Sequence, residues 1–433
     1  MEPLNIALIG CGTVGGGVAK LLLKQPERLA ARAGRPLVLR RVVVRDLDKQ
    51  RAIAVPRELL TTDLQQVIDD PSIQVAVELV GGVDWARQAV LELLAAGKDV
   101  VTANKALLAQ HGAEVFDAAR RHGRAVAFEA SVAGGIPIIA ALAQSLAANQ
   151  ILAIQGILNG TSNFILTSMT EGNKGYADAL AEAQRRGYAE ADPTLDVNGA
   201  DAAHKLAILA QIAFGVAVPM SAIECRGIAD VDALDIRFAG ELGYVIKLLA
   251  EAFLSDDQLA LHVSPVLLRR ATPLAQVRGA YNAISVVGDA VGDTLYYGQG
   301  AGQMPTASAV TADIIDLAVG RSQRTFQTLR LWNDNGTRTR LRPPDAVRTR
   351  FYLRLLVDDR PGVLADVARL LAQHQISIAS VIQHETPDET EGTRVQLVIM
   401  THTAATGAFR SAAADMERLG CVAAPAVYYP VGD

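Results

Sequence analysis

The beginning of the chain places a strand pattern, a glycine-rich turn and a helix pattern in direct succession. Residues 4–9 are a short apolar run of the kind that forms a buried strand. The turn reads Gly10-Cys11-Gly12-Thr13-Val14-Gly15, and a helical pattern follows it. Alone, such a turn is a weak signal. Between a strand and a helix it lets the backbone approach a pyrophosphate, so Gly10, Gly12, Thr13, Val14 and Gly15 are candidate dinucleotide-binding residues.

Strand and helix patterns then alternate. Strands are expected at residues 37–44, 73–80, 99–103 and 125–130, helices at residues 84–96 and from about residue 105, and a loop at residues 25–36. This alternation is typical of a parallel sheet with helices on its faces. The sequence therefore predicts a Rossmann-type α/β domain whose ligands bind beyond the carboxyl ends of the strands.

Positions at these strand ends have the chemistry of a cofactor site. Arg45 follows the second strand, where a basic residue suits the 2′-phosphate of NADP and an acidic one suits the ribose of NAD. Arg45 therefore favours NADP. Because the acidic Asp46 is next, NAD is the alternative. Gly81 and Lys105 follow the next two strands. A lysine near a helix start opposes the helix dipole, which favours a ligand partner over a purely solvent-facing role.

A second chemical signal lies in residues 183–205. The pattern predicts a helix that breaks at Gly187 and a second helix entered at Gly199. On the second helix Asp201 and Lys205 are four residues apart and share one face. Such a pair is ordinarily solvated, yet this helix is apolar nearly all round, which is typical of burial. A buried lysine must be paired or line a cavity, so Lys205 with Asp201 is a candidate acid/base group.

The same stretch resembles the signature of homoserine dehydrogenases. The matching positions are Ala183, Gly187, Tyr188, Asp192, Pro193, Asp196, Gly199, Asp201 and Lys205. The resemblance implies that Lys205 donates a proton to the substrate carbonyl. It also implies that Glu190, Asp196 and Asp201 hold the amino end of the substrate and the lysine, and it assigns Gly187 to the cofactor site.

Other stretches resemble the same family. Residues 101–106 match the motif whose lysine, here Lys105, lies by the nicotinamide and the substrate. Residues 156–164 also match, and Gly302 falls at a position beside the cofactor. A further stretch resembles the family's sodium loop, which implies main-chain carbonyl ligands at Glu129, Val132, Gly134 and Ile136. On chemistry alone, a glycine-rich linker between domains explains that loop equally well.

The C-terminal part has a different organisation. Residues 331–350 contain Pro343-Pro344 and repeated Thr-Arg pairs, so a linker is expected. Residues 351–433 then show the β-α-β-β-α-β order of a ferredoxin-like module. With Arg360-Pro361-Gly362 in its first turn the module resembles an ACT domain, which implies an amino-acid effector near Asp359 and Gly362 and pairing between modules. A purely structural dimerisation module is the alternative.

The sequence thus predicts three domains and a linker. Residues 1–136 and 300–330 form the dinucleotide-binding domain, because the helix after Gly302 is expected to return to the first sheet. Residues 137–299 form an α+β substrate-binding and dimerisation domain, with strands at 259–268, 283–288 and 294–298. Residues 331–350 are the linker and residues 351–433 the ACT domain.

Composition limits the partners. The chain has 433 residues, a net charge of -5 and 20% charged residues, which gives no electrostatic case for nucleic acid or membrane. Small molecules and other copies of the chain, as a dimer or tetramer, are the expected partners. Three widely separated cysteines and the absence of a signal or membrane segment predict a cytoplasmic protein.

The resemblance implies an activity: reversible reduction of L-aspartate 4-semialdehyde to L-homoserine by NADP(H), in threonine and methionine biosynthesis from aspartate. A monovalent cation, sodium first, is the second expected cofactor. One alternative is a dehydrogenase for another small carbonyl, which a substrate panel separates. The other is an amino-acid sensor whose ACT domain is the working part, which detectable turnover excludes.

Overall fold

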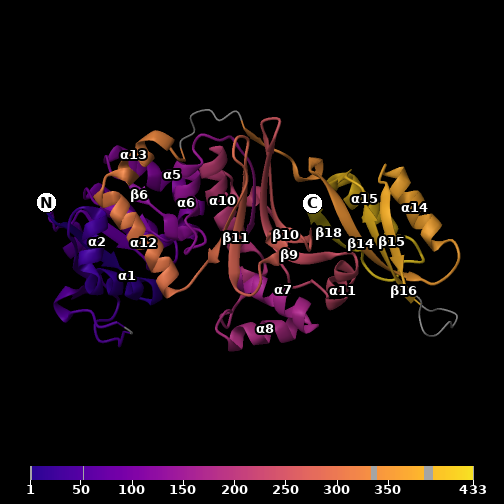
Figure 1. Ribbon diagram of the computed structural model, residues 1–433, viewed down its shortest axis with the longest axis horizontal. Helices are drawn as coiled ribbons and strands as arrows, with labels where there is room; N and C mark the ends of the chain where they lie inside the picture. Colours follow the sequence, from indigo (N-terminus) through magenta and orange to yellow (C-terminus); the bar gives the residue numbers. More distant parts are fainter. Residues whose placement is uncertain (1, 52, 333–338, 385–393, 433) are drawn as a thin grey trace. The chain divides into compact units, whose positions relative to one another are not determined.

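The computed structural model describes residues 2–51, 53–332, 339–384 and 394–432. The chain forms two compact units, each assembled from three separate segments (Figure 1). The first contains Met1–Ile154, Asp201–Ile223 and Ala280–Thr339, and the second contains Gln155–Ala200, Glu224–Gly279 and Arg340–Asp433. Among the described residues, no helix combines the length and the apolar character needed to cross a bilayer.

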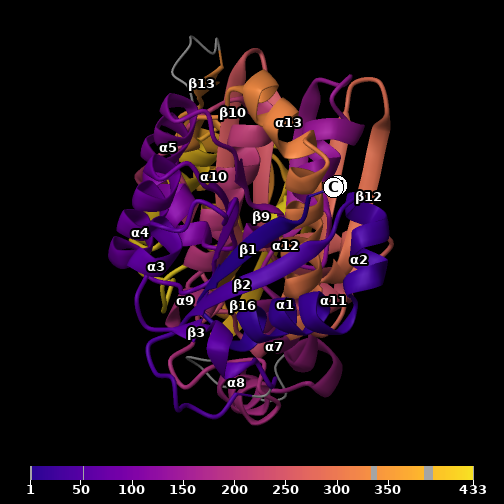
Figure 2. The same cartoon turned by 90° about the vertical axis from the view of Figure 1, so that its left-hand side faces the viewer.

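A six-stranded parallel sheet forms the centre of the first unit, with β1 and β2 side by side in Figure 2. The order is β3-β2-β1-β4-β5-β6. The strands are β1 (Leu4–Ile9), β2 (Leu37–Val43), β3 (Leu60–Thr61), β4 (Val75–Glu78), β5 (Asp99–Thr102) and β6 (Val126–Ala127). This is the order of a dinucleotide-binding sheet, whose topological switch lies between β1 and β4. The predicted Rossmann-type fold is confirmed.

Helices surround this sheet. They are α1 (Thr13–Lys24), α2 (Pro26–Ala33), α3 (Gln65–Ile68), α4 (Asp84–Ala95), α5 (Lys105–Arg121), α6 (Ile138–Ala140), α12 (Gln303–Ala318) and α13 (Arg321–Leu329), with α10 (Ala200–Phe214) entering the unit at Asp201. Short turns η1 (Arg57–Leu59), η2 (Glu129–Ser131), η3 (Ala141–Ser145) and η4 (Met220–Ala222) connect them. The strands β11 (Tyr281–Gly288) and β12 (Gly292–Gln299) form an antiparallel hairpin, and β7 (Ile151–Ile157) crosses the boundary between the units.

The local expectations for residues 25–36 and 125–130 were wrong. Residues 25–36 contain α2 rather than only a loop, because Pro26 occupies the first helical turn, good helix formers follow, and the helix ends at Gly34. The strand expected at 125–130 ends at Ala127, and the chain then turns through η2.

The helix α12 lies beside α1, far earlier in the sequence (Figure 1). The contact is close at Gly17, where a Cβ atom would lie 2.8 Å from the Ala307 Cβ and 2.9 Å from the Gln303 carbonyl oxygen. At the neighbouring Gly16 the nearest heavy atoms are 3.6 and 3.7 Å away, an ordinary contact distance.

We expect Gly17→Ala to lower the free energy of unfolding by about 1–3 kcal/mol, because a helix must shift to admit the methyl group. Gly16→Ala is the matched control, since its methyl group fits and alanine favours the helix by up to about 1 kcal/mol. Urea denaturation measures both changes. Equal stability of the two variants would contradict the close packing of α1 on α12.

In the described part of the second unit, the longer strands follow one another in the order β9-β10-β18-β14-β16-β15. They are β9 (Tyr244–Ser255), β10 (Gln258–Arg269), β14 (Arg348–Asp358), β15 (Ile378–Gln383), β16 (Arg394–Thr401) and β18 (Val427–Gly432), with short strands β8 (Glu224–Cys225) and β13 (Arg340–Leu341) on β10 and β17 (Ala404–Ala405) on β14. The helices are α7 (Gly160–Gly172), α8 (Tyr176–Arg185), α9 (Thr194–Val197), α11 (Ala233–Glu241), α14 (Val363–Gln373) and α15 (Thr406–Met416), with turns η5 (Leu274–Gln276) and η6 (Pro344–Ala346).

The C-terminal elements form the predicted ferredoxin-like module, which is confirmed. The strands β18, β14, β16 and β15 are antiparallel neighbours, and the core between them and α14 and α15 includes Phe351, Leu397 and Phe409. Its first strand begins at Arg348, inside the segment expected to be a linker. Residues 333–338 of that segment lie outside the described residues.

Candidate active site

Two lysines meet one aspartate in the first unit. Asp201, in the first turn of α10, accepts a hydrogen bond from Lys205 Nζ at 2.7 Å and forms an ion pair with Lys105 Nζ at 3.1 Å. The exposed fractions of the Asp201 and Lys205 side chains are 10% and 11%, against 38% for Lys105. The structure therefore brings together the three residues that sequence reasoning assigned to catalysis.

The sequence of α10 explains why these charges are fixed. Leu206, Ile208 and Leu209 are fully buried, so the helix is anchored on its apolar sides. The i, i+4 spacing then places Lys205 one turn beyond Asp201 on the same face. His204 is half-buried beside them, and burial, followed by the positive charge of Lys105, lowers the pKa of its imidazole. Sequence reasoning missed His204, whose type alone carries no signal in a helix of this kind.

The glycine-rich turn between β1 and α1 has the shape of a phosphate cradle. A Cβ atom at Gly15 would lie 2.2 Å from the Gly10 carbonyl oxygen, so the turn closes only with glycine there. Gly12 precedes the first turn of the twelve-residue α1 and has open space above its Cα, and Thr13 and Val14 begin the helix. The N-terminus of this helix can accept a pyrophosphate.

Two other expected cofactor positions lie at the same edge of the sheet. Arg45 is exposed just after β2. The carboxylate of its neighbour Asp46 accepts the backbone N–H groups of Asp48 and Lys49 at 2.8 and 3.2 Å, so it is already used within its own turn. Gly81, just after β4, is exposed with φ +77° and open space above it.

Gly302 and the expected cation loop belong to the same unit. Gly302, with φ +124°, immediately precedes α12. Glu129, Val132 and Ile136 are buried, and a Cβ atom at Gly134 would lie 2.8 Å from Thr306 Oγ1. The loop is therefore packed against the start of α12.

The other expected substrate residues belong to the second unit. Glu190 is exposed after α8, beyond Gly187, which has φ +74°. Asp196 is half-buried in α9 and accepts a hydrogen bond from Asn159 Nδ2 at 2.8 Å. Sequence reasoning recognised Asn159 only as a helix cap, a role it also performs through the Ser162 N–H at 2.8 Å.

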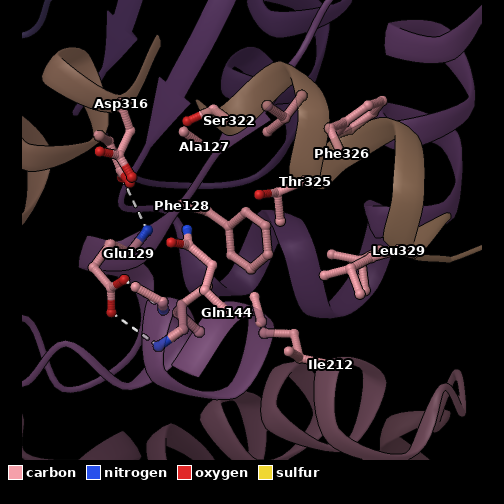
Figure 3. Close-up of a pocket in the computed structure, with 16 residues that line it drawn as sticks. Ala127, Phe128, Glu129, Gln144, Ile212, Asp316, Ser322, Thr325, Phe326 and Leu329 are labelled. Atoms are coloured by element: carbon pink, nitrogen blue, oxygen red, sulfur yellow. Dashed lines mark hydrogen bonds between the residues drawn. The ribbon is translucent and has the colours of Figure 1, made fainter. Parts of the chain in front are cut away.

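A pocket of about 60 Å³ lies beside the loop in which a cation is expected (Figure 3). Phe128, Phe326 and Leu329 form an apolar side, and Glu129, Asp313 and Asp316 supply carboxyl groups. The Glu129 carboxylate accepts the N–H groups of Ile139 and Ala140 at 2.9 and 2.8 Å, while its own N–H donates to Asp313 Oδ2 at 2.9 Å.

Burial controls the protonation of this pocket. It raises the pKa of Glu129 from 4.5 to about 7, against the backbone hydrogen bonds, which lower it. Burial and then the charge of Glu129 also raise the pKa of Asp313 well above its usual range. The pocket therefore favours protonated carboxyl groups in the folded protein.

This pKa shift predicts a pH dependence of stability. Because folded Glu129 holds its proton more tightly than the unfolded chain, its stabilising contribution is complete below pH 4.5 and is lost as the pH rises to about 7. Glu129→Gln should therefore reduce the fall in unfolding free energy between these pH values. Urea denaturation across the interval tests this, and an unchanged slope would contradict titration of Glu129.

The expected effector residues lie on the first turn of the ferredoxin-like module. Asp359 and Gly362 are exposed between β14 and α14, and Gly362 has φ +96°. Asp359 Oδ1 accepts a hydrogen bond from Gln383 Nε2 at 3.3 Å. The turn is thus tied to β15, the edge strand of the module.

The chain matches known families along most of its length. Residues 10–129 match the model described as homoserine dehydrogenase, NAD binding domain; residues 137–315 match the model described as homoserine dehydrogenase; and residues 351–420 match the ACT domain. The ACT domain expected from the sequence is therefore confirmed.

Individual relatives match the whole chain. A homoserine dehydrogenase of Neisseria gonorrhoeae is 44% identical over 98% of each chain. The crystal structure of a homoserine dehydrogenase from Thiobacillus denitrificans is 45% identical, with a TM-score of 0.93 over 100% of this chain and 99% of that one. A hyperthermophilic archaeal homoserine dehydrogenase in complex with NADPH is 27% identical, with a TM-score of 0.61 over 73% of this chain and 97% of that one.

Sequence and structure lead to one assignment. The parallel sheet carries a dinucleotide-binding turn, an apolar helix holds a lysine against an aspartate, and the relatives cover the chain from end to end. The chain belongs to the homoserine dehydrogenase family, a family of oxidoreductases, and it carries a C-terminal ACT domain.

Proposed function

We propose that the enzyme reversibly reduces L-aspartate 4-semialdehyde to L-homoserine with NADP(H), in the biosynthesis of threonine and methionine from aspartate. The observation that carries this proposal is the shielded ammonium of Lys205, held at 2.7 Å by Asp201. The family of the chain supports this reaction, and the glycine-rich turn before α1 fits a dinucleotide.

The bound nicotinamide would supply a hydride to the aldehyde carbon. Negative charge then develops on the substrate oxygen, and Lys205 would stabilise this alkoxide and donate its proton from Nζ. Asp201 would keep the lysine oriented and balance its charge. The exposed fraction of 11% at Lys205 supports this role, because an ammonium acts more strongly on a developing charge when water is largely excluded.

We assign substrate recognition to the remaining charged residues. Glu190 and Asp196 would hold the substrate ammonium, because a buried cation needs a carboxylate partner. Lys105, with an exposed fraction of 38%, would attract the substrate carboxylate or steady the nicotinamide region. Gly187 and Gly302 would lie beside the cofactor. Both have a positive φ, which favours glycine at each position.

NADP is the preferred cofactor in this proposal. Arg45 is exposed immediately after β2, and the carboxylate of Asp46 accepts hydrogen bonds from the backbone N–H groups of Asp48 and Lys49. The relative in complex with NADPH supports the same preference. We expect kcat/KM to be higher with NADPH than with NADH, and Arg45→Ala to shrink that ratio by raising the KM for NADPH alone. Equal loss with both cofactors would contradict a contact with the 2′-phosphate.

We propose two further ligands. A monovalent cation, sodium first, would bind main-chain oxygens of Glu129, Val132, Gly134 and Ile136, a loop packed against Thr306. An amino acid, threonine first, would bind near Asp359 and Gly362 in the ACT domain. We also propose a homo-oligomer, and the three unpaired cysteines support a cytoplasmic location.

A substrate panel tests the function. Purified enzyme is given NADPH and aspartate semialdehyde or other small aldehydes and ketones, and the absorbance of NADPH is followed. The highest kcat/KM is expected with aspartate semialdehyde, and the reverse reaction is expected with homoserine and NADP. A better carbonyl substrate would favour a different dehydrogenase. Absence of turnover, with an amino acid still bound at the ACT domain, would favour the sensor alternative.

A further inference from the structure

The first unit contains a buried carboxylate, that of Glu78, close to the expected cofactor residue Gly81. This carboxylate has no role in the mechanism proposed for the enzyme. Glu78 is the last residue of β4 and is 0% exposed. It pairs in register with Thr102, the last residue of β5, which is also 0% exposed. An ionised carboxylate is rarely buried unless its oxygens are used, so the hydrogen bonds of Glu78 show what it holds.

The two carboxylate oxygens of Glu78 accept hydrogen bonds from two different segments of the chain. Oε1 accepts the backbone N–H of Val80 at 2.8 Å and that of Gly81 at 3.4 Å, which fixes the turn that follows β4. Oε2 accepts the hydroxyl of Thr102 at 2.7 Å. The carboxylate therefore joins the turn after β4 to the end of β5.

Thr102 extends this link to the helix that begins with Lys105. Its Oγ1 accepts the backbone N–H of Asn104 at 3.0 Å. Asn104 is the N-cap of α5, because its Oδ1 accepts the N–H of Leu107 at 3.1 Å. Its Nδ2 donates to the Gly82 carbonyl oxygen at 2.6 Å, so the start of α5 is also bonded directly to the turn that follows β4.

The held elements are the ones that face the expected ligands. Gly81 and Gly82 both have positive φ and open space above their Cα atoms, and both are exposed while Glu78 behind them is buried. Lys105, the first residue of α5, reaches Asp201 at 3.1 Å. A small rotation of α5 would move this ammonium relative to the carboxylate.

We propose that Glu78 is a positioning residue: through Thr102 and Asn104 it ties the Gly81–Gly82 turn to the start of α5 and so fixes Lys105 against Asp201. This inference rests on the proposed function for the role of Lys105. A charged acceptor suits the task because its hydrogen bonds are shorter and stronger than those of a neutral group.

The test begins with Thr102→Val, which keeps the shape of the side chain and removes the hydroxyl. We expect kcat/KM for aspartate semialdehyde to fall by about 10- to 100-fold, since small misplacements of catalytic groups cost up to this much. NADPH affinity should change much less. Thr102→Ser restores the hydroxyl and should restore most of the activity.

The matched control is Thr311→Val. Thr311 is 3% exposed in the same unit, and its hydroxyl donates to Ala307 within its own helix at 2.7 Å. Both valine variants lose one buried hydroxyl, and Tm should fall further in Thr102→Val, which loses two hydrogen bonds where Thr311→Val loses one. Only Thr102→Val should reduce kcat/KM strongly. Equal kinetic loss in both variants would overturn the proposal.

A second variant guards against misfolding of the first. Asn104→Ser keeps an oxygen that can cap α5 but loses the amide that donates to Gly82. It should lower kcat/KM by about 5- to 100-fold, between the loss of one hydrogen bond and a full misplacement. Unchanged activity in both Thr102→Val and Asn104→Ser would reject the link.

Two further measurements separate positioning from general damage and from failure of the proposed function. In a Lys105→Ala background, Thr102→Val should cost little more activity, because residues acting as one unit are not additive; the same cost in both backgrounds would overturn the inference. Amide exchange at residues 80–82 and 104–107 needs no turnover. The exchange should become faster in Thr102→Val and not in Thr311→Val. This result is expected even if the wild-type enzyme reduces a different carbonyl compound. Unchanged exchange in Thr102→Val would reject the proposed link between the two segments.

Discussion

Lys205→Ala should lower kcat for the reduction of aspartate semialdehyde by about 10²- to 10⁴-fold, the usual share of a general acid. The ammonium removed is the one that Asp201 holds at 2.7 Å, so the variant loses a proton donor kept at a fixed position. NADPH binding should persist, because the glycine-rich turn and Arg45 are separate from this side chain. Stopped-flow single turnovers and NADPH fluorescence titration measure the two effects.

Two companion variants sharpen this result. Lys20→Ala removes an exposed lysine of α1 and should leave kcat unchanged. Lys205→Arg keeps the positive charge but cannot release its proton near neutral pH, so it should remain slow if proton donation is the role of Lys205. Near-normal turnover in Lys205→Ala would remove Lys205 from the mechanism. Recovery in Lys205→Arg would reduce its role to charge stabilisation.

Asp201→Asn should lower kcat/KM by about 10²- to 10³-fold, the cost typical of losing one preorganised electrostatic group. Asp201 lies between Lys105 at 3.1 Å and Lys205 at 2.7 Å, and asparagine would leave two ammonium groups facing a neutral amide. Their repulsion would displace the lysines and favour loss of a proton from one of them. Steady-state kinetics over a range of pH values measures the change.

Asp99→Asn is the control for this variant. Asp99 is half-buried in the first unit, where it accepts hydrogen bonds from Ala125 N–H and Gln323 Nε2 at the opposite end of β5. Its replacement should affect stability more than kcat/KM. The double variant Asp201→Asn with Lys205→Ala should be no slower than the worse single variant, and additive losses would show that the two residues act independently.

The local sequence predicted the parts of the fold that depend on pattern. The apolar run before Gly10, the glycines that follow and the helix to Lys24 appear together as β1, its turn and α1. The helix Val363–Gln373 and the strand Arg394–Thr401 take their places in the β-α-β-β-α-β order that was predicted for the ACT domain. Such elements can be predicted from the local sequence, because their periodicity is strict and their turn residues have a single conformational role.

Elements without a distinctive period were not found. The strand β9, Tyr244–Ser255, is a mostly apolar segment that contains Lys247 and Glu251 and that a buried helix would match equally well. It becomes a strand by pairing with β10 along its full length. The helix α9, Thr194–Val197, is too short to show a period. The strands β4 and β6 proved shorter than expected, because their ends are decided by neighbouring loops.

Part of the candidate site could also be predicted from the local sequence. Asp201 and Lys205 share one helix, so their spacing fixes their geometry without knowledge of the fold. Lys105 joins them from another helix through a contact that no local pattern contains. Glu78 gave no signal, because it lay inside the strand expected at residues 73–80, where a single acidic side chain is ordinarily exposed to solvent.

The place of α12 against α1 has a consequence for synthesis of the protein. The helix α1 is synthesised early, but α12, which contains the Ala307 that contacts Gly17, is complete only 294 residues after the end of α1, counted from residue 24 to residue 318. At about 5–20 residues per second this delay is roughly 15–60 s, during which the nascent domain carries an uncovered apolar face. Chaperones that shield such surfaces would have their longest opportunity here.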